Sequence, residues 1–266
     1  MAQNTPSRAF CRTSGLVAVL LMATVWTIQG CSEKEFDPND PKKSFGIAKE
    51  YYDDESWDMA ITKLGEFKSR FPYSQYAVEA ELLIANSHFE LDQFIEAAAA
   101  YEQFAKLHPK HPKLDFAMFR VGESHWKDAP EEIDREQEYT IKAIEEWQKL
   151  VDRMPTSSWS EKAKGLIEQG KRRLAESSEF VSKFYCRREI YHACAFRYIK
   201  LAAEFSQFPD LKRNALSEAA RALDILATQK EAAPDSDKNL YFKKYSPAAL
   251  RAQAAELRRQ LAEIPR

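Results

Sequence analysis

Residues 51–72 read YYDDESWDMAITKLGEFKSRFP, and the pattern of this stretch decides the fold. Two tyrosines end one amphipathic segment, and after a short polar stretch a second segment begins. In the second segment the small Ala60 is followed by Leu64 and Phe67, four and seven residues later, and Pro72 closes it. Apolar residues at such spacings are typical of a helix with one buried side. The stretch therefore predicts two helices joined by a short turn.

The same pattern recurs about 37 residues further along the chain and then once more. In the second unit the small residue is Ala97, and His108-Pro109 ends the segment. In the third unit the second segment comes nine residues late, has Ala143 as its small residue and ends at Met154-Pro155. The residues four and seven positions after the small ones are large and apolar in all three units: Leu64, Tyr101 and Trp147, then Phe67, Phe104 and Leu150.

This is the tetratricopeptide pattern, in which units of about 34 residues each pack two antiparallel helices and stack into a solenoid. A looser fourth unit has Cys194 at the small position, followed by Tyr198 and Leu201. A fifth, degenerate unit covers residues 211–228, and Pro247 opens a last helix. We therefore predict an all-α solenoid of about five helix pairs.

Two other segments stand out within this solenoid. Residues 160–187 lack a clear helix breaker and predict one long helix. The insertion at residues 127–138 is acidic and lies between the two helices of the third unit. Insertions in repeat proteins lie on one face and often contact partners, although a solvated loop explains this one equally well.

The N-terminus has the layout of a secretory signal: a basic start, then the mostly apolar residues 15–28. A membrane-spanning helix needs about 20 apolar residues, so a retained span is the weaker interpretation. Ile28-Gln29-Gly30-Cys31 resembles a bacterial lipobox, in which Cys31 takes a diacylglycerol and the acyl chains, such as palmitate, anchor the protein. The alternative is an ordinary signal peptide with a chance cysteine. Because Ser32 is not the aspartate that retains such lipoproteins in the inner membrane, we expect the outer membrane.

The predicted organisation follows from these boundaries. It comprises a lipoprotein signal peptide, a lipidated flexible tether, the tetratricopeptide solenoid, and a polar loop with a C-terminal helix: residues 1–30, 31–43, 44–228 and 229–266.

The chain shows no motif for catalysis. Its seven glycines are isolated, so none forms a phosphate-binding loop, and its five histidines have no metal-binding spacing. His88 and His125 occupy equivalent repeat positions, which packing explains better than metal ligation. A net charge of −2 argues against nucleic acid as a partner. We predict no enzyme activity, no catalytic residue, no metal and no cofactor.

Cys186 and Cys194 lie eight residues apart across a predicted turn between two helices. In an oxidising compartment a disulfide must be considered. Cys194 at the small position is explained by core packing alone, so reduced core thiols are the favoured interpretation and a disulfide is the alternative.

The first helix of each tetratricopeptide unit lines the concave face, mainly through its second, fifth, ninth, twelfth and thirteenth positions. Lys42 and Lys49 occupy two of these positions and could meet a carboxylate terminus. Part of the apolar residues at these positions could instead belong to the core between repeats. The apolar set predicts a groove for a peptide with aromatic side chains: Phe45, Tyr52, Leu82, Phe89, Phe116, Phe119 and Trp126.

Longer motifs resemble the BamD/ComL lipoproteins, the tetratricopeptide subunits of the outer-membrane β-barrel assembly machine. The resemblance is close over residues 31–205 and weaker beyond them. The motifs that carry it are Trp57-x-x-Ala60-Ile61-Thr62-x-Leu64, Arg70-Phe71-Pro72-Tyr73, His108-Pro109-x-x-Pro112-x-x-Asp115-Phe116-x-Met118, Arg120-x-Gly122 and Leu150-Val151-x-x-x-Pro155-x-Ser157.

The resemblance implies a lipid-anchored scaffold on the periplasmic side of the outer membrane of a Gram-negative bacterium. Its N-terminal units would receive the aromatic C-terminal signals of unfolded outer-membrane proteins. Its C-terminal units would dock on the barrel-forming, BamA-like subunit, and other assembly lipoproteins would bind as well. Arg197 stands where the family has a docking arginine and would pair with a carboxylate there, the alternative being a solvated surface charge. A different periplasmic tetratricopeptide adaptor, serving envelope constriction or peptidoglycan synthesis, is the competing interpretation.

Overall fold

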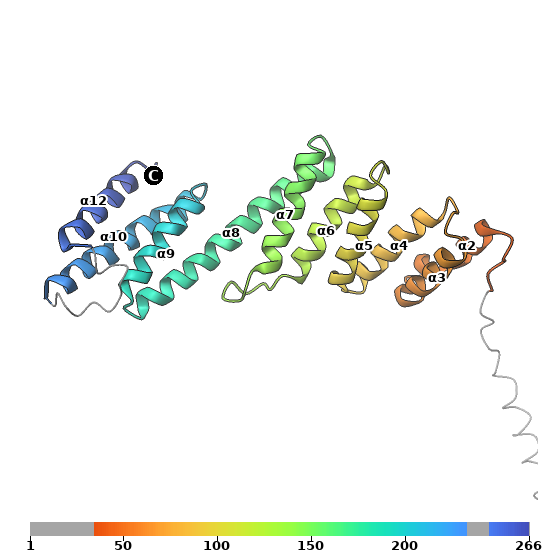
Figure 1. Cartoon of the computed structure of the whole chain (residues 1–266), viewed down its shortest axis with the longest axis horizontal. Helices are drawn as coiled ribbons and strands as arrows, with labels where there is room; N and C mark the ends of the chain where they lie inside the picture. Colours follow the sequence, from red (N-terminus) through yellow and green to blue (C-terminus); the bar gives the residue numbers. More distant parts are fainter. Residues whose placement is uncertain (1–34, 233–244, 266) are drawn as a thin grey trace, which may run out of the picture.

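A computed structural model describes residues 35–232 and 245–265 of the 266-residue chain. The predicted signal peptide and lipidation site Cys31 lie outside the described residues, as does most of the predicted polar loop. Within the described ranges the chain forms helices and no strand, and the helices build an elongated solenoid (Figure 1). The helices are α2 Pro41–Asp53, α3 Trp57–Arg70, α4 Ala77–Glu90, α5 Phe94–Leu107, α6 Leu114–Asp128, α7 Glu138–Arg153, α8 Ser158–Arg187, α9 Tyr191–Glu204, α10 Pro209–Ala232 and α12 Pro247–Ala262.

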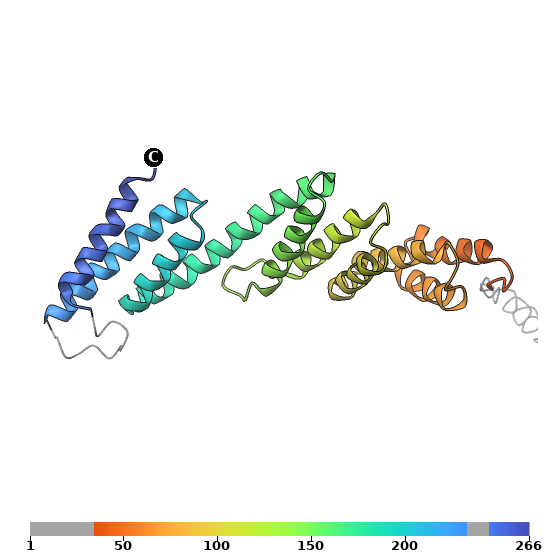
Figure 2. The same cartoon turned by 45° about the horizontal axis from the view of Figure 1, so that its top comes forward.

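Each helix packs mainly against its neighbours in the sequence, so that five helix pairs follow one another along the long axis (Figure 2). The pairs are α2–α3, α4–α5, α6–α7, α8–α9 and α10–α12. The predicted all-α tetratricopeptide solenoid of about five helix pairs is therefore confirmed. The single long helix expected at residues 160–187 is also present, as α8.

The repeat register read from the sequence matches the packing. The small residues of the first four units are at most 1% exposed, as are the large residues four and seven positions after them. The small side chain lets each second helix approach the first, and the large ones fill the seam between the helices. The small residues are Ala60, Ala97, Ala143 and Cys194.

Three of the turns between paired helices share one backbone geometry. Glu55, Asp92 and Glu189 have φ angles of 57°, 57° and 59°. In each turn the next residue's amide donates to the carbonyl five residues before it, at 2.8 to 3.0 Å. Glycine is the usual residue in this left-handed conformation, and here an acidic residue adopts it each time. Because no glycine stands at these positions, the sequence predicted short turns but not their left-handed geometry.

The helix ends have local causes. Proline follows the ends of α3, α5 and α7 within two residues, where it cannot continue the helix. The side chains of Asp40, Ser157 and Ser246 accept hydrogen bonds from backbone amides at the starts of α2, α8 and α12. Such caps satisfy amides that have no partner inside the helix.

The two ends of the solenoid differ from the sequence interpretation. At the N-terminal end α2 begins at Pro41, inside the segment interpreted as a tether. At the C-terminal end residues 211–228, interpreted as a degenerate unit, belong to the single helix α10. The partner of α10 is α12, because α12 buries Leu250, Ala254 and Leu257 in the C-terminal core. The two helices of the last pair are thus separated in the sequence by residues 233–246, which do not follow the repeat pattern.

Candidate peptide-binding surface

One side of the solenoid carries a connected polar network, which we call the helix A network because helices α2, α4, α6 and α8 supply most of it. Asn86 on α4 donates to the hydroxyl of Tyr52 on α2, at 3.2 Å. The Asn86 carbonyl in turn accepts a 2.6 Å hydrogen bond from the hydroxyl of Tyr101. Tyr101 belongs to α5 and reaches this side with its hydroxyl only, because its ring is fully buried. Burial raises the pKa of Tyr101, so the phenol stays protonated and can donate.

Arg120 on α6 extends the network toward the C-terminus. Its Nε donates to Tyr101 at 3.2 Å, and its two terminal nitrogens contact Glu123 at 2.9 Å and Glu90 at 3.3 Å. Burial alone would lower the pKa of Arg120, but its contacts with Tyr101 and Glu123 outweigh burial and raise it. Lys162 on α8 lies 3.9 Å from the other oxygen of Glu123. This chain of contacts therefore links α2, α4, α6 and α8, the first helices of the first four units.

Aromatic rings line this network. The guanidinium of Arg120 lies 3.7 Å from the ring centroid of Phe89, and Phe116 lies 5.6 Å from the same group. The Phe116 ring also makes an edge contact with Trp159 on α8, at 5.3 Å between centroids. Phe89 and Phe116 are both partly exposed. The surface thus presents rings beside hydrogen-bonding groups, a combination suited to a peptide with aromatic side chains.

Three of the seven predicted groove residues do not lie on this surface. Phe45, Leu82 and Phe119 are core residues with 6%, 3% and 0% exposure. All three occupy the fifth position in the repeat numbering, counted from Pro41, Val78 and Asp115, and neighbouring helices cover that position. Phe119, for example, lies between Trp147 and Trp159, with centroids at 6.1 and 4.8 Å. Burial removes these three side chains from contact with a peptide.

The other four predicted groove residues remain at the surface in part. Tyr52, Phe89 and Trp126 occupy the twelfth position in the repeat numbering, in the last turns of their helices, where coverage by the next helix is incomplete. Phe116 occupies the second position in the repeat numbering. In the structure, therefore, the side chains at the twelfth position are partly exposed and those at the fifth position are buried. Seven residues make almost two turns, so sequence spacing places both positions on the same side of the helix.

The two lysines considered for a carboxylate terminus differ in their surroundings. Lys49 forms a salt bridge with Asp53, at 2.5 and 2.7 Å. Lys42 is exposed at the start of α2. Lys49 is therefore already paired within its own helix.

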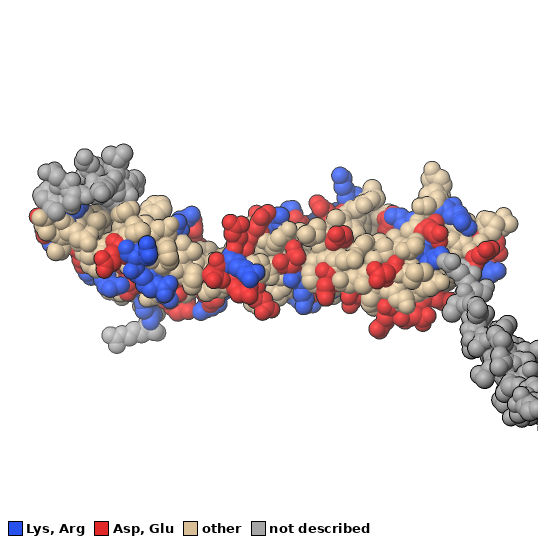
Figure 3. Space-filling view, turned by 90° about the horizontal axis from the view of Figure 1, so that it is seen from below, with Lys and Arg blue, Asp and Glu red and all other residues tan. Residues whose placement is uncertain are grey.

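Arg197 lies on α9 with its guanidinium 4.6 Å from the ring centroid of Tyr185 on α8. It forms no salt bridge with any residue in the described ranges. Three large rings nearby in the sequence are exposed, although sequence reasoning did not single them out: Phe180 at 38%, Phe184 at 47% and Phe196 at 52%. Exposed rings of this size are typical of interaction surfaces. Lys and Arg also gather over the C-terminal third of the face shown in Figure 3.

The favoured interpretation of the cysteines, reduced core thiols, was wrong, and the disulfide considered as the alternative is the one present. Cys186 at the end of α8 and Cys194 on α9 form a disulfide, with their Cα atoms 5.0 Å apart. Cys194 is buried as predicted, but the tight turn at Glu189 also folds the end of α8 back toward it. Spacing in sequence could not show this, because the left-handed turn residue is not a glycine.

The acidic insertion is an ordered loop. Gln137, near its end, is buried and donates to the carbonyls of Glu132 and Arg135 at 3.0 and 3.3 Å. Thr140 donates to the Gln137 side chain at 2.8 Å. Hydrogen bonds of the Gln137 side chain thus stabilise this loop.

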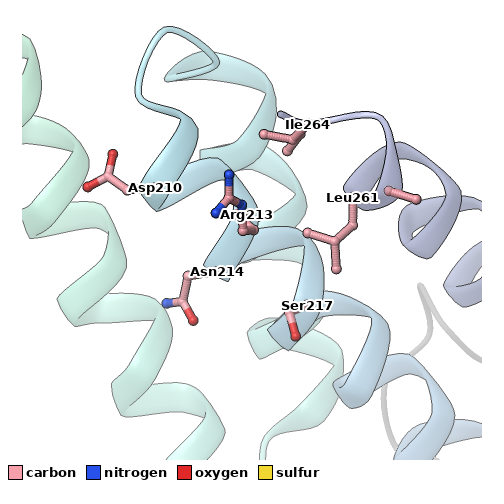
Figure 4. Close-up of a pocket in the computed structure, with 7 residues that line it drawn as sticks. Asp210, Arg213, Asn214, Ser217, Leu261 and Ile264 are labelled. Atoms are coloured by element: carbon pink, nitrogen blue, oxygen red, sulfur yellow. The ribbon is translucent and has the colours of Figure 1, made fainter. Parts of the chain in front are cut away.

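A hollow of about 970 Å³ lies between α10 and the end of α12 (Figure 4). Several of its polar side chains already have partners. Arg213 donates to the carbonyl of Pro265, Asn214 donates to Glu179, and Asp210 pairs with Arg172 at 2.6 Å. Three of the polar side chains that line the hollow are therefore already paired within the chain. In the described part of the chain no group of His, Cys, Asp and Glu side chains is arranged to hold a metal.

None of the described helices is long and apolar enough to cross a membrane.

Comparison with known proteins identifies relatives over most of the chain. Residues 37–239 match the model of the YfiO family, described as outer membrane lipoprotein. The outer membrane protein assembly factor BamD of Vibrio cholerae is 28% identical over 78% of this chain and 85% of its own length. The BamD of Neisseria gonorrhoeae is 24% identical over 71% of this chain and 75% of its own length.

Proposed function

The chain belongs to the YfiO (BamD) family of outer membrane lipoproteins, and from this membership we propose that it is an assembly factor for outer-membrane proteins. It acts by binding rather than by catalysis. It is held by lipid on Cys31 at the periplasmic side of the outer membrane. The observation that supports binding most directly is the helix A network, which aligns partly exposed rings and hydrogen-bonding groups along four successive units.

The ligand of the helix A network is, in this proposal, the aromatic C-terminal signal of an unfolded outer-membrane protein. Phe89 and Phe116 offer ring surfaces, and Arg120 between them is held by Glu90, Glu123 and Tyr101. A held guanidinium does not have to be ordered when a peptide binds, which lowers the entropic cost of association. The network is therefore preorganised for an extended chain.

Replacing Phe89 with alanine should weaken binding of a synthetic peptide that ends in phenylalanine by about 1 kcal/mol or more. The replacement removes ring contact area and also the surface on which Arg120 stacks. Fluorescence anisotropy of a labelled peptide measures the affinity. Ile95→Ala serves as the control, because Ile95 is exposed on α5, outside the helix A network. Unchanged affinity in a folded Phe89→Ala variant would reject this surface as the peptide site.

The second part of the proposal is a docking surface at the α8–α9 end of the molecule. It contains Arg197 on the Tyr185 ring and the exposed Phe184, whose ring lies 5.5 Å from that of Tyr185. The proposed partner is the barrel-forming assembly subunit, which would supply a carboxylate to Arg197. Rings around an arginine are a common composition for the centre of an interface.

Arg197→Glu should reduce copurification of the barrel-forming subunit from gently solubilised membranes by about tenfold or more. The reversed charge meets the partner's carboxylate and repels it. Lys149→Glu on α7 is the matched control, because Lys149 is exposed and lies on a different pair of helices. Copurification at the wild-type level in Arg197→Glu would contradict the docking assignment. Absence of any barrel subunit from wild-type preparations would contradict the assembly function itself.

A further inference from the structure

Arg173, in the middle of α8, has a ring partner but no hydrogen-bonding partner. Its guanidinium lies 3.9 Å from the ring centroid of Trp126 on α6. Its Nη1 is buried without a hydrogen bond. The side chain as a whole is partly exposed, and the guanidinium makes no hydrogen bond or salt bridge within the described chain. Its other two nitrogens are therefore open to a ligand.

The neighbouring cations of α8 are paired, which makes Arg173 distinctive. Lys164 and Lys171 pair with glutamates one turn earlier, at 2.5 and 2.9 Å. Arg172 pairs with Glu176 at 3.1 Å and with Asp210 at 2.6 Å.

Burying the Arg173 guanidinium without a hydrogen-bonding partner also has an energetic cost. Burial lowers the pKa of Arg173, and the carboxylates of Glu131 and Glu176, beyond salt-bridge distance, offset this only in part. A buried charged donor without a partner is unfavourable. A carboxylate ligand bound to the two open nitrogens would offset the cost of the unpaired charge.

The position of Arg173 continues the helix A network. Arg173 follows Lys162 by eleven residues, which is three helical turns or about 16 Å, so the two cations lie on the same side of α8. Lys162 is the last residue of the network, through its contact with Glu123. On α6, Trp126 follows Phe116 by ten residues, about 15 Å along the helix. An extended peptide of about five residues spans that distance.

We propose that Arg173, stacked on Trp126, binds the C-terminal carboxylate of the polypeptide that lies along the helix A network. This assignment rests on the proposed peptide-binding function and adds a direction to it: the chain end lies at α8. The planar guanidinium matches a carboxylate with two parallel hydrogen bonds. The Trp126 ring holds the guanidinium plane and offers a contact for the last aromatic side chain. Lys49, by contrast, is already paired with Asp53.

The test compares one peptide ending in phenylalanine in two forms, with a free C-terminal acid and with an amide. Binding is measured by fluorescence anisotropy on the full-length protein in detergent. Wild-type protein should bind the acid about tenfold more tightly than the amide, the value of one charge-assisted hydrogen-bonding contact. Arg173→Gln should bind the acid about tenfold more weakly and should no longer distinguish the two forms. Arg173→Lys, which keeps the charge and loses the planar fork, should retain part of the preference.

Arg172→Gln is the matched control, since Arg172 is the adjacent exposed residue with partners of its own. It should keep the full preference for the acid. Equal binding of acid and amide by wild-type protein would overturn the inference and leave the peptide-binding surface intact. A preference that survives in Arg173→Gln would overturn it as well.

Two further outcomes separate the alternatives. If an internal aspartate or glutamate of the peptide, and not its end, accounts for the sensitivity to Arg173→Gln, a side-chain carboxylate is the ligand and the terminal assignment is wrong. If neither form of the peptide binds, the proposed function fails together with the inference.

Discussion

Replacing Gly122 with alanine should destabilise the protein by about 2 kcal/mol, although alanine is the better helix former. A Cβ at this position would lie 2.5 Å from two atoms of the Trp147 ring and 2.9 Å from a third. Trp147 is fully buried, and its Nε1 donates to the carbonyl of Phe119 at 3.1 Å. The ring cannot move away without losing that bond or overpacking the core. Those two costs, each about 1–3 kcal/mol, exceed the gain of about 1 kcal/mol in helix propensity.

Gly165→Ala is the matched control for Gly122→Ala. Gly165 also lies within a helix, but a Cβ there would have no atom within 4 Å apart from its chain neighbours and the nearby backbone of its own helix. Alanine at this position should stabilise the protein by about 0.5–1 kcal/mol. Urea unfolding followed by circular dichroism gives both values. Stabilisation of both variants would show that helix propensity, and not the contact with Trp147, governs these positions.

Removing the disulfide should cost about 2.5 kcal/mol of stability in the C-terminal units. The bond closes a short loop between Cys186 and Cys194, eight residues apart, and the expected loss follows from the loop-closure entropy of that length. Alanine is chosen instead of serine, so that the double variant Cys186→Ala/Cys194→Ala places no hydroxyl group in the core. Its urea midpoint should fall below that of the oxidised wild type, and reductant should bring the wild type to a similar midpoint. Reductant should leave the double variant unchanged.

A reductant-insensitive wild type would contradict the expected contribution of the disulfide. The same comparison bears on docking, because the bond joins the end of α8 to α9 next to Tyr185 and Arg197. The cross-link restricts how far these two side chains can separate. Weaker copurification of the barrel-forming subunit with the double variant is therefore expected to accompany the loss of stability.

The repeat could be predicted almost completely from the sequence, because it depends on local spacing. Small and large residues at the start of each second helix, with a proline after it, determine which side each helix buries. Ala60, Ala97, Ala143 and Cys194 are all buried as their spacing requires. The last pair could not be predicted in this way. α10 and α12 pair although residues 233–246 separate them in the sequence, and no repeat spacing connects them.

The candidate site could be predicted only in part. Spacing identified the helices that form the surface, and Tyr52, Phe89, Phe116 and Trp126 do lie partly exposed on them. Spacing did not separate these residues from Phe45, Leu82 and Phe119, because coverage by the adjacent helix depends on how the helices cross. The partners of Arg120 and the open guanidinium of Arg173 likewise come from several helices.

The sequence by itself therefore determined the class of fold, the register of the first four units and the family resemblance. Each of these depends on residues close together in the chain. Only the tertiary structure decided which aromatic rings are exposed, which charged side chains form salt bridges and whether Cys186 and Cys194 form a disulfide. Those outcomes depend on distances between helices and on the geometry of the turns that join them, and a periodic pattern carries no information about either.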